Sequence, residues 1–201
     1  TAVTLNPKRE WTSVINQTLG FVYQESKKDL DAAITSYQSA YLQTPEDIDI
    51  YINLGSAFYD KEDFNNALTV YRNALDLQPK NAKIHCNLGF LYWGNGDLDE
   101  AIKEYELAIE YDENYDIAYN NLGVIYLDDL GRVQKAIELF KKSIACNPNY
   151  ALAQFNLARA ITITGDKIEA AKLYQNAQNI NNVTNEIDPQ EIVDKISALF
   201  E

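Results

Sequence analysis

The chain has 201 residues, of which 46% are apolar and 11% aromatic, and it carries a formal net charge of −13. This acidic balance argues against nucleic acid or an anionic membrane surface as a partner, and no segment is long and apolar enough to insert into a membrane. The sequence begins with Thr1 and contains no Met, which suggests a processed product or a fragment. We therefore expect a cytoplasmic location and leave open a signal peptide that has been removed.

In chain order, the first expected element is a polar leader over residues 1–11, or alternatively the start of an extended first helix. Trp11 is expected to pack against the N-terminal end of the core. Five pairs of helices then follow, because turn signals such as Asn95-Gly96-Asp97 separate apolar patterns of helical spacing. We expect these pairs at residues 12–45, 46–79, 80–113, 114–148 and 149–182.

Residues 183–201 hold a linker and one further helix. Asp188 is a favourable N-cap and Pro189 suits the first helical position. We expect this helix to cap the last pair by covering its apolar side. The alternative is that it docks on another chain.

One phrase, Asn-Leu-Gly, recurs every 34 residues. It ends on Gly55, Gly89 and Gly123. An alanine follows each glycine 12 or 13 residues later: Ala67, Ala101 and Ala136. Because a glycine inside a helix costs roughly 1 kcal/mol relative to alanine, its recurrence indicates close packing. We expect the glycine of the first helix of each pair to face the alanine of the second.

This pattern resembles the tetratricopeptide repeat, a helix–turn–helix unit of 34 residues. The second unit matches the motif at Tyr51, Leu54, Gly55, Phe58, Ala67, Tyr71, Ala74 and Pro79. The third and fourth units match nearly as well, and the first and fifth are degenerate. The first and fourth units are each one residue longer than 34. In the fourth unit we expect the extra residue in the turn near Leu130-Gly131. The resemblance implies an all-α, right-handed superhelical solenoid of five repeats with a C-terminal capping helix.

No catalytic constellation is found in the sequence. The one histidine, His85, takes the place of a motif tryptophan and is expected to pack. Cys86 and Cys146 are expected to be reduced thiols, and together with one histidine they make no zinc set. We therefore expect no metal, no other cofactor and no enzymatic activity.

In this family the first helix of each repeat lines a concave groove, and a stripe on that helix is not used by the core. The predicted peptide-binding residues on the stripe are Asn53, Tyr59, Lys83, Asn87, Phe90, Trp93, Asn120, Asn121, Val124, Leu127, Phe155, Asn156 and Arg159. Four asparagines at one repeat position form a ladder: Asn53, Asn87, Asn121 and Asn156. Amides both donate and accept hydrogen bonds, so the ladder suits a peptide backbone. Alternatively, these amides pair with a neighbouring repeat, and the apolar members are buried beneath the leader or the last helix.

Some members of the family hold a C-terminal carboxylate in a clamp of basic and amide side chains. Lys83, Asn87 and Asn121 match its first places, but Leu152 and Asn156 stand where basic residues are needed, so we do not expect the clamp. The predicted function is a non-enzymatic interaction module or scaffold that binds an extended or helical peptide segment of another protein. The alternatives are a self-assembling homo-oligomeric scaffold and a regulatory or substrate-recruiting segment of a larger enzyme.

Overall fold

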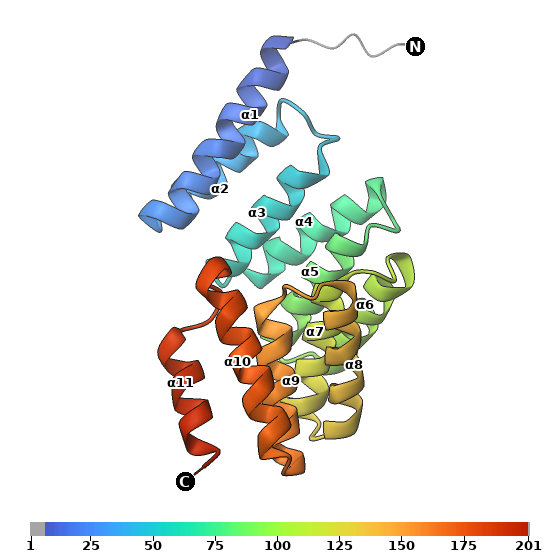
Figure 1. Cartoon of the computed structure of the whole chain (residues 1–201). Coiled ribbons are helices and arrows are strands. Elements are labelled where there is room, and N and C mark those ends of the chain that lie inside the picture. The colour runs from blue at the N-terminus through green and yellow to red at the C-terminus, as the bar shows by residue number, and fades with distance from the viewer. Residues whose placement is uncertain (1–6, 201) are drawn as a thin grey trace. The chain divides into compact units, whose positions relative to one another are not determined.

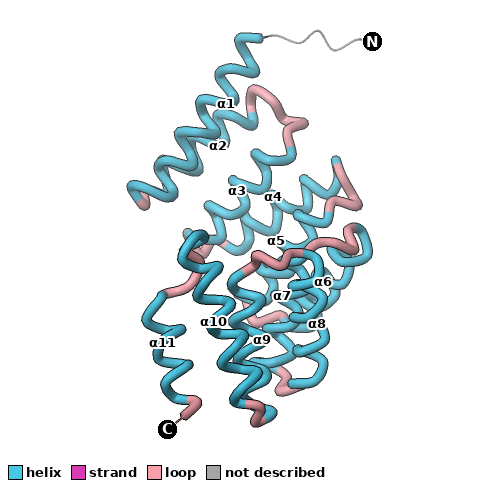
Figure 2. Tube along the Cα trace, viewed as in Figure 1, coloured by secondary structure: helices cyan, strands magenta, loops and turns pink. Residues whose placement is uncertain are grey.

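The computed structural model describes residues 7–200, which are almost entirely helical and contain no strand (Figure 1). The tube in Figure 2 shows short loops joining the helices. Two compact units divide between Asp97 and Leu98, and each is described by itself. The all-α fold class is confirmed. Residues 1–6 of the predicted leader and residue 201 lie outside the described residues.

The first unit contains five α-helices and one π-helical turn. These are α1 (Pro7–Val22), η1 (Tyr23–Lys27), α2 (Leu30–Tyr41), α3 (Ile48–Asp60), α4 (Phe64–Leu77) and α5 (Ala82–Gly94). Helix α1 packs on α2, and α3 packs on α4. Helix α1 therefore begins inside the stretch predicted as a leader, at Pro7, where the ring is tolerated because a first-turn N–H needs no helical partner.

The second unit contains six α-helices and one π-helical turn. These are α6 (Leu98–Tyr111), α7 (Asp116–Val124), η2 (Ile125–Asp129), α8 (Val133–Cys146), α9 (Ala151–Thr164), α10 (Lys167–Thr184) and α11 (Pro189–Ala198). Helix α7 packs on α8, and α9 packs on α10.

Within the pairs, a glycine of the first helix lies against an aromatic ring of the second. A Cβ atom added to Gly123 would lie 2.6 Å from Cε1 of Phe140, and one added to Gly55 would meet the ring of Tyr71. The prediction that the glycine faces an alanine was therefore wrong. The glycine makes room for a fully buried ring, since a core packed at crystal density leaves no space for an added methyl group.

The extra residue of the first and fourth repeats lies in a π-helical turn. In the second repeat, the N–H of Asp63 donates to the carbonyl of Phe58, five residues earlier. The corresponding bond joins Arg132 to Tyr126 and Asp29 to Tyr23, six residues earlier in both cases. The fourth repeat therefore keeps its turn near Leu130-Gly131 and takes up the insertion at the end of the preceding helix, as single π-helical turns do.

The last helix covers the outer side of α10. Ile192 of α11 and Leu199, which directly follows this helix, are buried in the same apolar cluster as the α9–α10 pair. The linker is fixed by buried Asn181, whose Nδ2 donates to the carbonyl of Ile187 at 2.6 Å and whose Oδ1 accepts from Ile187 N at 2.8 Å. Asp188 caps the helix by accepting from the N–H of Gln190, as predicted for this residue.

Candidate interaction surfaces

A cavity of about 280 Å³ opens along α3 and α5 in the first unit. Its lining consists of Ile52, Asn53, Ser56, Tyr59, Asp60, Tyr71, Lys83, Asn87 and Phe90. The structure thus brings together five of the predicted peptide-binding residues. We call this cavity the α3–α5 groove.

Amide groups are available in the α3–α5 groove. Asn53 and Asn87 are both half-buried and occupy one position in successive repeats. Among the described residues, no hydrogen bond engages the side-chain amide of either one. Both amides can therefore donate and accept toward a ligand in the groove without breaking a bond inside the protein.

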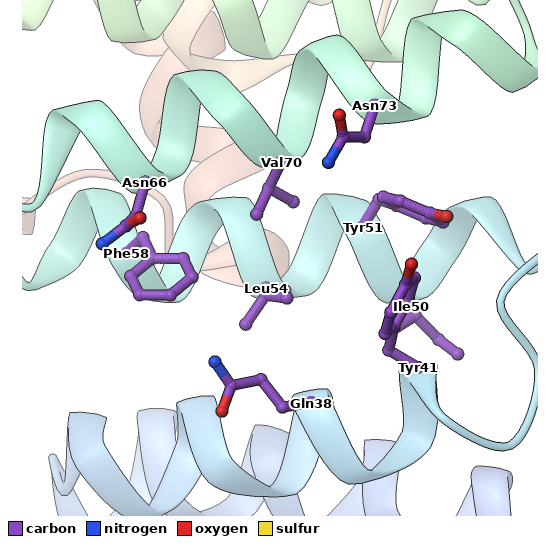
Figure 3. A pocket seen from close by; sticks show the side chains of 9 residues that line it. All are labelled: Gln38, Tyr41, Ile50, Tyr51, Leu54, Phe58, Asn66, Val70 and Asn73. Carbon is purple, nitrogen blue, oxygen red and sulfur yellow. The ribbon is translucent and has the colours of Figure 1, made fainter.

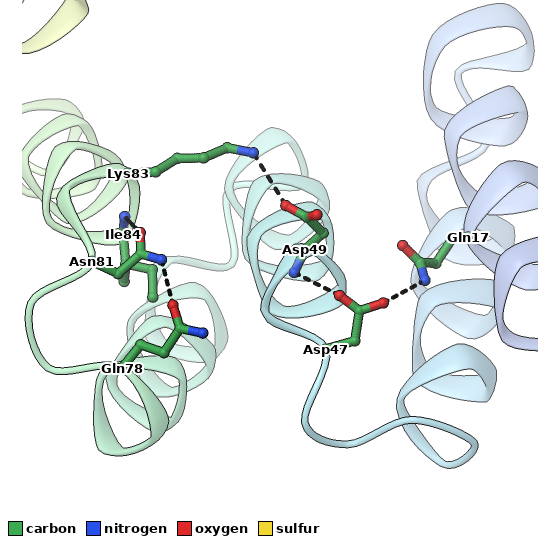
Figure 4. Close-up of polar contacts among 7 residues, drawn as sticks. All are labelled: Gln17, Asp47, Asp49, Gln78, Asn81, Lys83 and Ile84. Atoms are coloured by element: carbon green, nitrogen blue, oxygen red, sulfur yellow. Dashed lines mark hydrogen bonds and ion pairs between the residues drawn. The ribbon is translucent and has the colours of Figure 1, made fainter. Parts of the chain in front are cut away.

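Charged side chains stand at the edges of the groove, on helices whose N-termini are capped by side chains (Figure 4). Lys83 Nζ lies 3.4 Å from Asp49 Oδ1, and both side chains are more than half exposed. Asp47 caps α3 and also accepts from Gln17 Nε2 at 3.0 Å. Because an exposed ion pair contributes only about 0–1 kcal/mol, the Lys83 ammonium remains able to turn toward a ligand.

Aromatic rings form one wall of the groove. The ring centroids of Tyr59 and Phe90 lie 4.9 Å apart, and those of Phe90 and Trp93 lie 6.2 Å apart. Phe90 is 40% exposed. Burial, and then the charge of Asp60, raises the pKa of Tyr59, so its hydroxyl stays protonated at neutral pH. The wall therefore presents an uncharged apolar surface.

In the second unit, apolar residues of the predicted stripe are buried in the core. Leu127 and Phe155 are buried, and the ring of Phe155 packs against Tyr174 at a centroid distance of 5.4 Å. Both were predicted to lie on a peptide-binding stripe that the core does not use, and their burial shows that this placement was wrong. The repeat position of Phe155 also holds Ile52, Cys86 and Asn120, all buried. This position belongs to the core in the second to fifth repeats.

The asparagines of the second unit hydrogen-bond one another. Asn156 is buried, and its Nδ2 donates to Oδ1 of buried Asn120 at 3.0 Å. Arg159 donates to Asn156 Oδ1 at 3.2 Å and pairs with Asp128 at 2.8 Å. Asn121 accepts from Asn120 at 3.2 Å. For Asn156 the alternative of pairing with a neighbouring repeat is therefore correct. Val124, also predicted in the stripe, is half-buried against the core.

A second cavity, of about 260 Å³, lies between α2, α3 and α4 and was missed by the sequence analysis (Figure 3). Figure 3 shows Leu54, Phe58 and Val70 between the amides of Gln38 and Asn73. Leu54 and Phe58 match core positions of the motif, so nothing marked them as cavity lining. The signal that was available is the pair of amides Asn66 and Asn73, two turns apart on α4.

The remaining chemistry-bearing side chains take part in packing. His85 is buried, with Nε2 3.0 Å from the carbonyl oxygen of Pro79. Neither Cys86 nor Cys146 forms a disulfide in the described part of the chain. Over residues 7–200, no group of three His, Cys, Asp or Glu side chains could hold a metal ion. None of the described helices has the length and hydropathy of a membrane span.

Three family models match the chain. One described as TPR repeat covers residues 55–96, and two described as tetratricopeptide repeat cover 86–151 and 139–172. The chain belongs to the tetratricopeptide repeat family. Members of this family act as scaffolds for interactions between proteins. No curated protein sequence matches the chain.

Solved structures share the fold over most of the chain. A crystal structure of the MamA protein is 26% identical with a TM-score of 0.61, over 88% of this chain and 97% of that one. The pilF protein of Pseudomonas aeruginosa is 20% identical with a TM-score of 0.74, over 96% of this chain and 90% of that one. A chain of the APC/C hetero-tetramer Cut9-Hcn1 is 16% identical with a TM-score of 0.77, over 94% of this chain and 36% of that one. The last two likenesses concern the fold alone.

Proposed function

We propose that the protein binds a short peptide segment of a partner protein in the α3–α5 groove. The observation that carries this proposal is the cavity itself, where the amides of Asn53 and Asn87 stand beside the wall of Tyr59 and Phe90. A site with a few polar groups on an apolar wall is typical of a recognition pocket. Asn53 and Asn87 are the members of the predicted ladder that line this cavity, and their side-chain amides make no hydrogen bond to the described residues.

The chemistry of the groove defines the segment that it fits. Asn53 and Asn87 would hydrogen-bond the backbone of an extended peptide, which works for any sequence. Tyr59 and Phe90 would contact one apolar side chain of the peptide. Asp60 lines the same groove, and the chain carries a net charge of −13, so basic residues beside the apolar one are favoured.

The comparisons support an interaction role of this kind. The chain belongs to a family of interaction scaffolds, and one structural neighbour was crystallised as a hetero-tetramer with another protein. The proposal that the peptide binds in the first unit rests on the geometry of the α3–α5 groove.

The test begins with a random peptide library displayed on phage and selected on the whole chain. The dissociation constant of a selected peptide is then measured by fluorescence polarisation for wild type, Phe90→Ala, Asn87→Ala and Asn73→Ala. We expect Phe90→Ala to weaken binding by about 30-fold, the equivalent of 2 kcal/mol at a hot spot, and Asn87→Ala by about tenfold. Asn73→Ala removes the same group from the second cavity and should leave affinity unchanged. Peptides that bind wild type and Phe90→Ala equally would refute the groove.

A further inference from the structure

Helix α1 has its polar side turned inward and its apolar side turned outward. The inward side carries Ser13, Gln17 and Gly20 on α1 and continues with Gln24 on η1; Ser13 and Gln24 are buried at 2% and 8% exposure. The exposed large hydrophobic residues on α1 are Trp11, Val14, Ile15, Leu19, Phe21 and Val22. An ordinary surface helix has the opposite arrangement. The predicted packing of Trp11 against the core was therefore wrong, because its side chain is 71% exposed.

The inward face is polar because its partners are polar. Ser13 Oγ lies 2.6 Å from Thr44 Oγ1, and Gln17 Nε2 donates to the N-cap residue Asp47. Gln24 Nε2 donates to Asp60 Oδ2 at 2.6 Å and its Oε1 accepts from Tyr37 at 3.2 Å. These bonds fix the rotation of α1 about its axis. The apolar side cannot turn inward without leaving buried polar groups unpaired.

The exposed face, which we call the α1 stripe, is large. With roughly 200 Å² for each aromatic side chain, Trp11 at 71% and Phe21 at 60% exposure present about 250 Å². Four aliphatic residues at 37–56% exposure add to this area, and the total reaches the size of the largest apolar patches on monomeric proteins, which are often functional. Such a surface indicates an interface rather than scattered exposed side chains.

The order of residues along the stripe points to its partner. Lys8, Trp11, Ile15, Thr18, Val22 and Glu25 follow one another at intervals of three or four residues and so share a face. The face carries a positive charge at its start and a negative charge at its end. In an antiparallel pair of two copies centred between Asn16 and Gln17, Trp11 lies opposite Val22 and Lys8 lies opposite Glu25. The same alignment sets Val14 opposite Leu19 and Ile15 opposite Thr18, so the charged ends are complementary and most apolar residues of the centre face apolar ones.

We infer that two copies of the chain associate through antiparallel packing of their α1 stripes. This interface is isologous, the commonest arrangement in homo-oligomers, and it involves a different surface from the α3–α5 groove. The area is about half of what a standard interface buries per partner, so we expect a dissociation constant on the order of micromolar. Dimerisation would place two peptide grooves in one particle.

The experiment measures mass by sedimentation equilibrium at concentrations from about 1 to 200 µM. Wild type should shift from the 22.8 kDa of one chain toward twice that value as concentration rises. Ile15→Glu should raise the dissociation constant at least tenfold. Ile163→Glu replaces an isoleucine that is 62% exposed on α9 and serves as the matched control, with the dimer unchanged. A single species of 22.8 kDa at 200 µM for wild type would overturn the inference.

A charge exchange tests the antiparallel alignment. Lys8→Glu and Glu25→Lys should each weaken the dimer several-fold, because each places like charges opposite one another at both ends. The double variant Lys8→Glu/Glu25→Lys should restore the wild-type constant. Both substituted positions are exposed, so circular dichroism should report unchanged helix content for all three variants. Losses that add in the double variant would refute this alignment. A wild-type monomer that binds vesicles of anionic phospholipid would assign the stripe to a membrane surface instead.

Discussion

Asn53 and Asn87 in the first unit and Asn156 in the second unit occupy the same place in their repeats, but their environments are opposite. Asn53 and Asn87 line an open cavity, whereas Asn156 is buried and bonded to Asn120. The difference arises one position earlier in the repeat. Ile52 fills that buried place in the second repeat and needs no hydrogen bond, but Asn120 in the fourth repeat does.

One core residue thus decides whether a groove amide is available to a ligand. Asn156 donates to Asn120 because a buried amide without a partner costs about 1–3 kcal/mol. Arg159 donates a hydrogen bond to Asn156 and pairs with Asp128, so its guanidinium is engaged inside the protein. The asparagine ladder is therefore continuous in the sequence but differs in chemistry between the units, and peptide binding is proposed only for the first unit.

The largest expected difference between the units appears at alkaline pH. Burial is the main cause that raises the pKa of Tyr37 and of Tyr51 in the first unit to about 12. A raised folded-state pKa stabilises the fold below pH 10, and that stability is lost as the pH rises from 10 toward 12, because the unfolded chain ionises first. Each tyrosine should remove on the order of 2 kcal/mol from the free energy of unfolding over this window.

Urea denaturation at pH 9 and pH 11 measures this loss. Both tryptophans, Trp11 and Trp93, lie in the first unit, so their fluorescence reports that unit while circular dichroism reports both. We expect the fluorescence midpoint to fall further than the midpoint of the helical signal. Tyr37→Phe removes one ionising group and should reduce the fall. An equal loss in this variant and in wild type would show that Tyr37 does not ionise with the raised pKa.

The sequence predicted the fold far better than the site. The 34-residue period determined every helix pair, because glycine, alanine and ring positions recur wherever helices must approach closely. The site depends on which amides are left unpaired, and that follows from single substitutions such as Asn120 that carry no period. Likewise, Trp11 was expected to be buried because it is large and apolar. Its exposure depends on the hydrogen bonds that hold the other side of α1, and these join residues about 30 positions apart.

The asparagine comparison itself predicts unequal costs. Asn156→Ala should lower the free energy of unfolding by about 2 kcal/mol, because Asn120 keeps a buried carbonyl without a donor. Asn87→Ala should change it by less than about 0.5 kcal/mol, since its amide bonds to nothing described. Both values come from urea denaturation followed by circular dichroism.

A double substitution separates hydrogen bonding from packing at this position. Asn120→Leu/Asn156→Leu replaces both partners by apolar groups of similar size and should be nearly neutral. If this double variant loses as much stability as Asn156→Ala, the amide pair is not the reason for the cost, and the contrast between the units fails.

The smallest expected effect concerns the turns between the paired helices, where the units also differ. The residue two positions before the start of the second helix has a positive φ in each turn: Lys28 (53°), Glu62 (62°), Gly96 (87°), Gly131 (62°) and Gly165 (92°). The second unit uses glycine at both of its positions, whereas the first uses Lys28 and Glu62 at two of three. A non-glycine residue in this conformation costs about 1 kcal/mol.

Glu62→Gly should therefore stabilise the first unit by about 0.5 kcal/mol, less than the full cost because glycine also gains freedom in the unfolded chain. Gly165→Ala should destabilise the second unit by about 1 kcal/mol, and this cost is purely conformational because an added Cβ meets nothing within 4 Å. Glu62→Ala keeps the backbone cost but removes the charge. If it stabilises as much as Glu62→Gly, the gain comes from a lower acidic charge, and the turns of the two units are energetically alike.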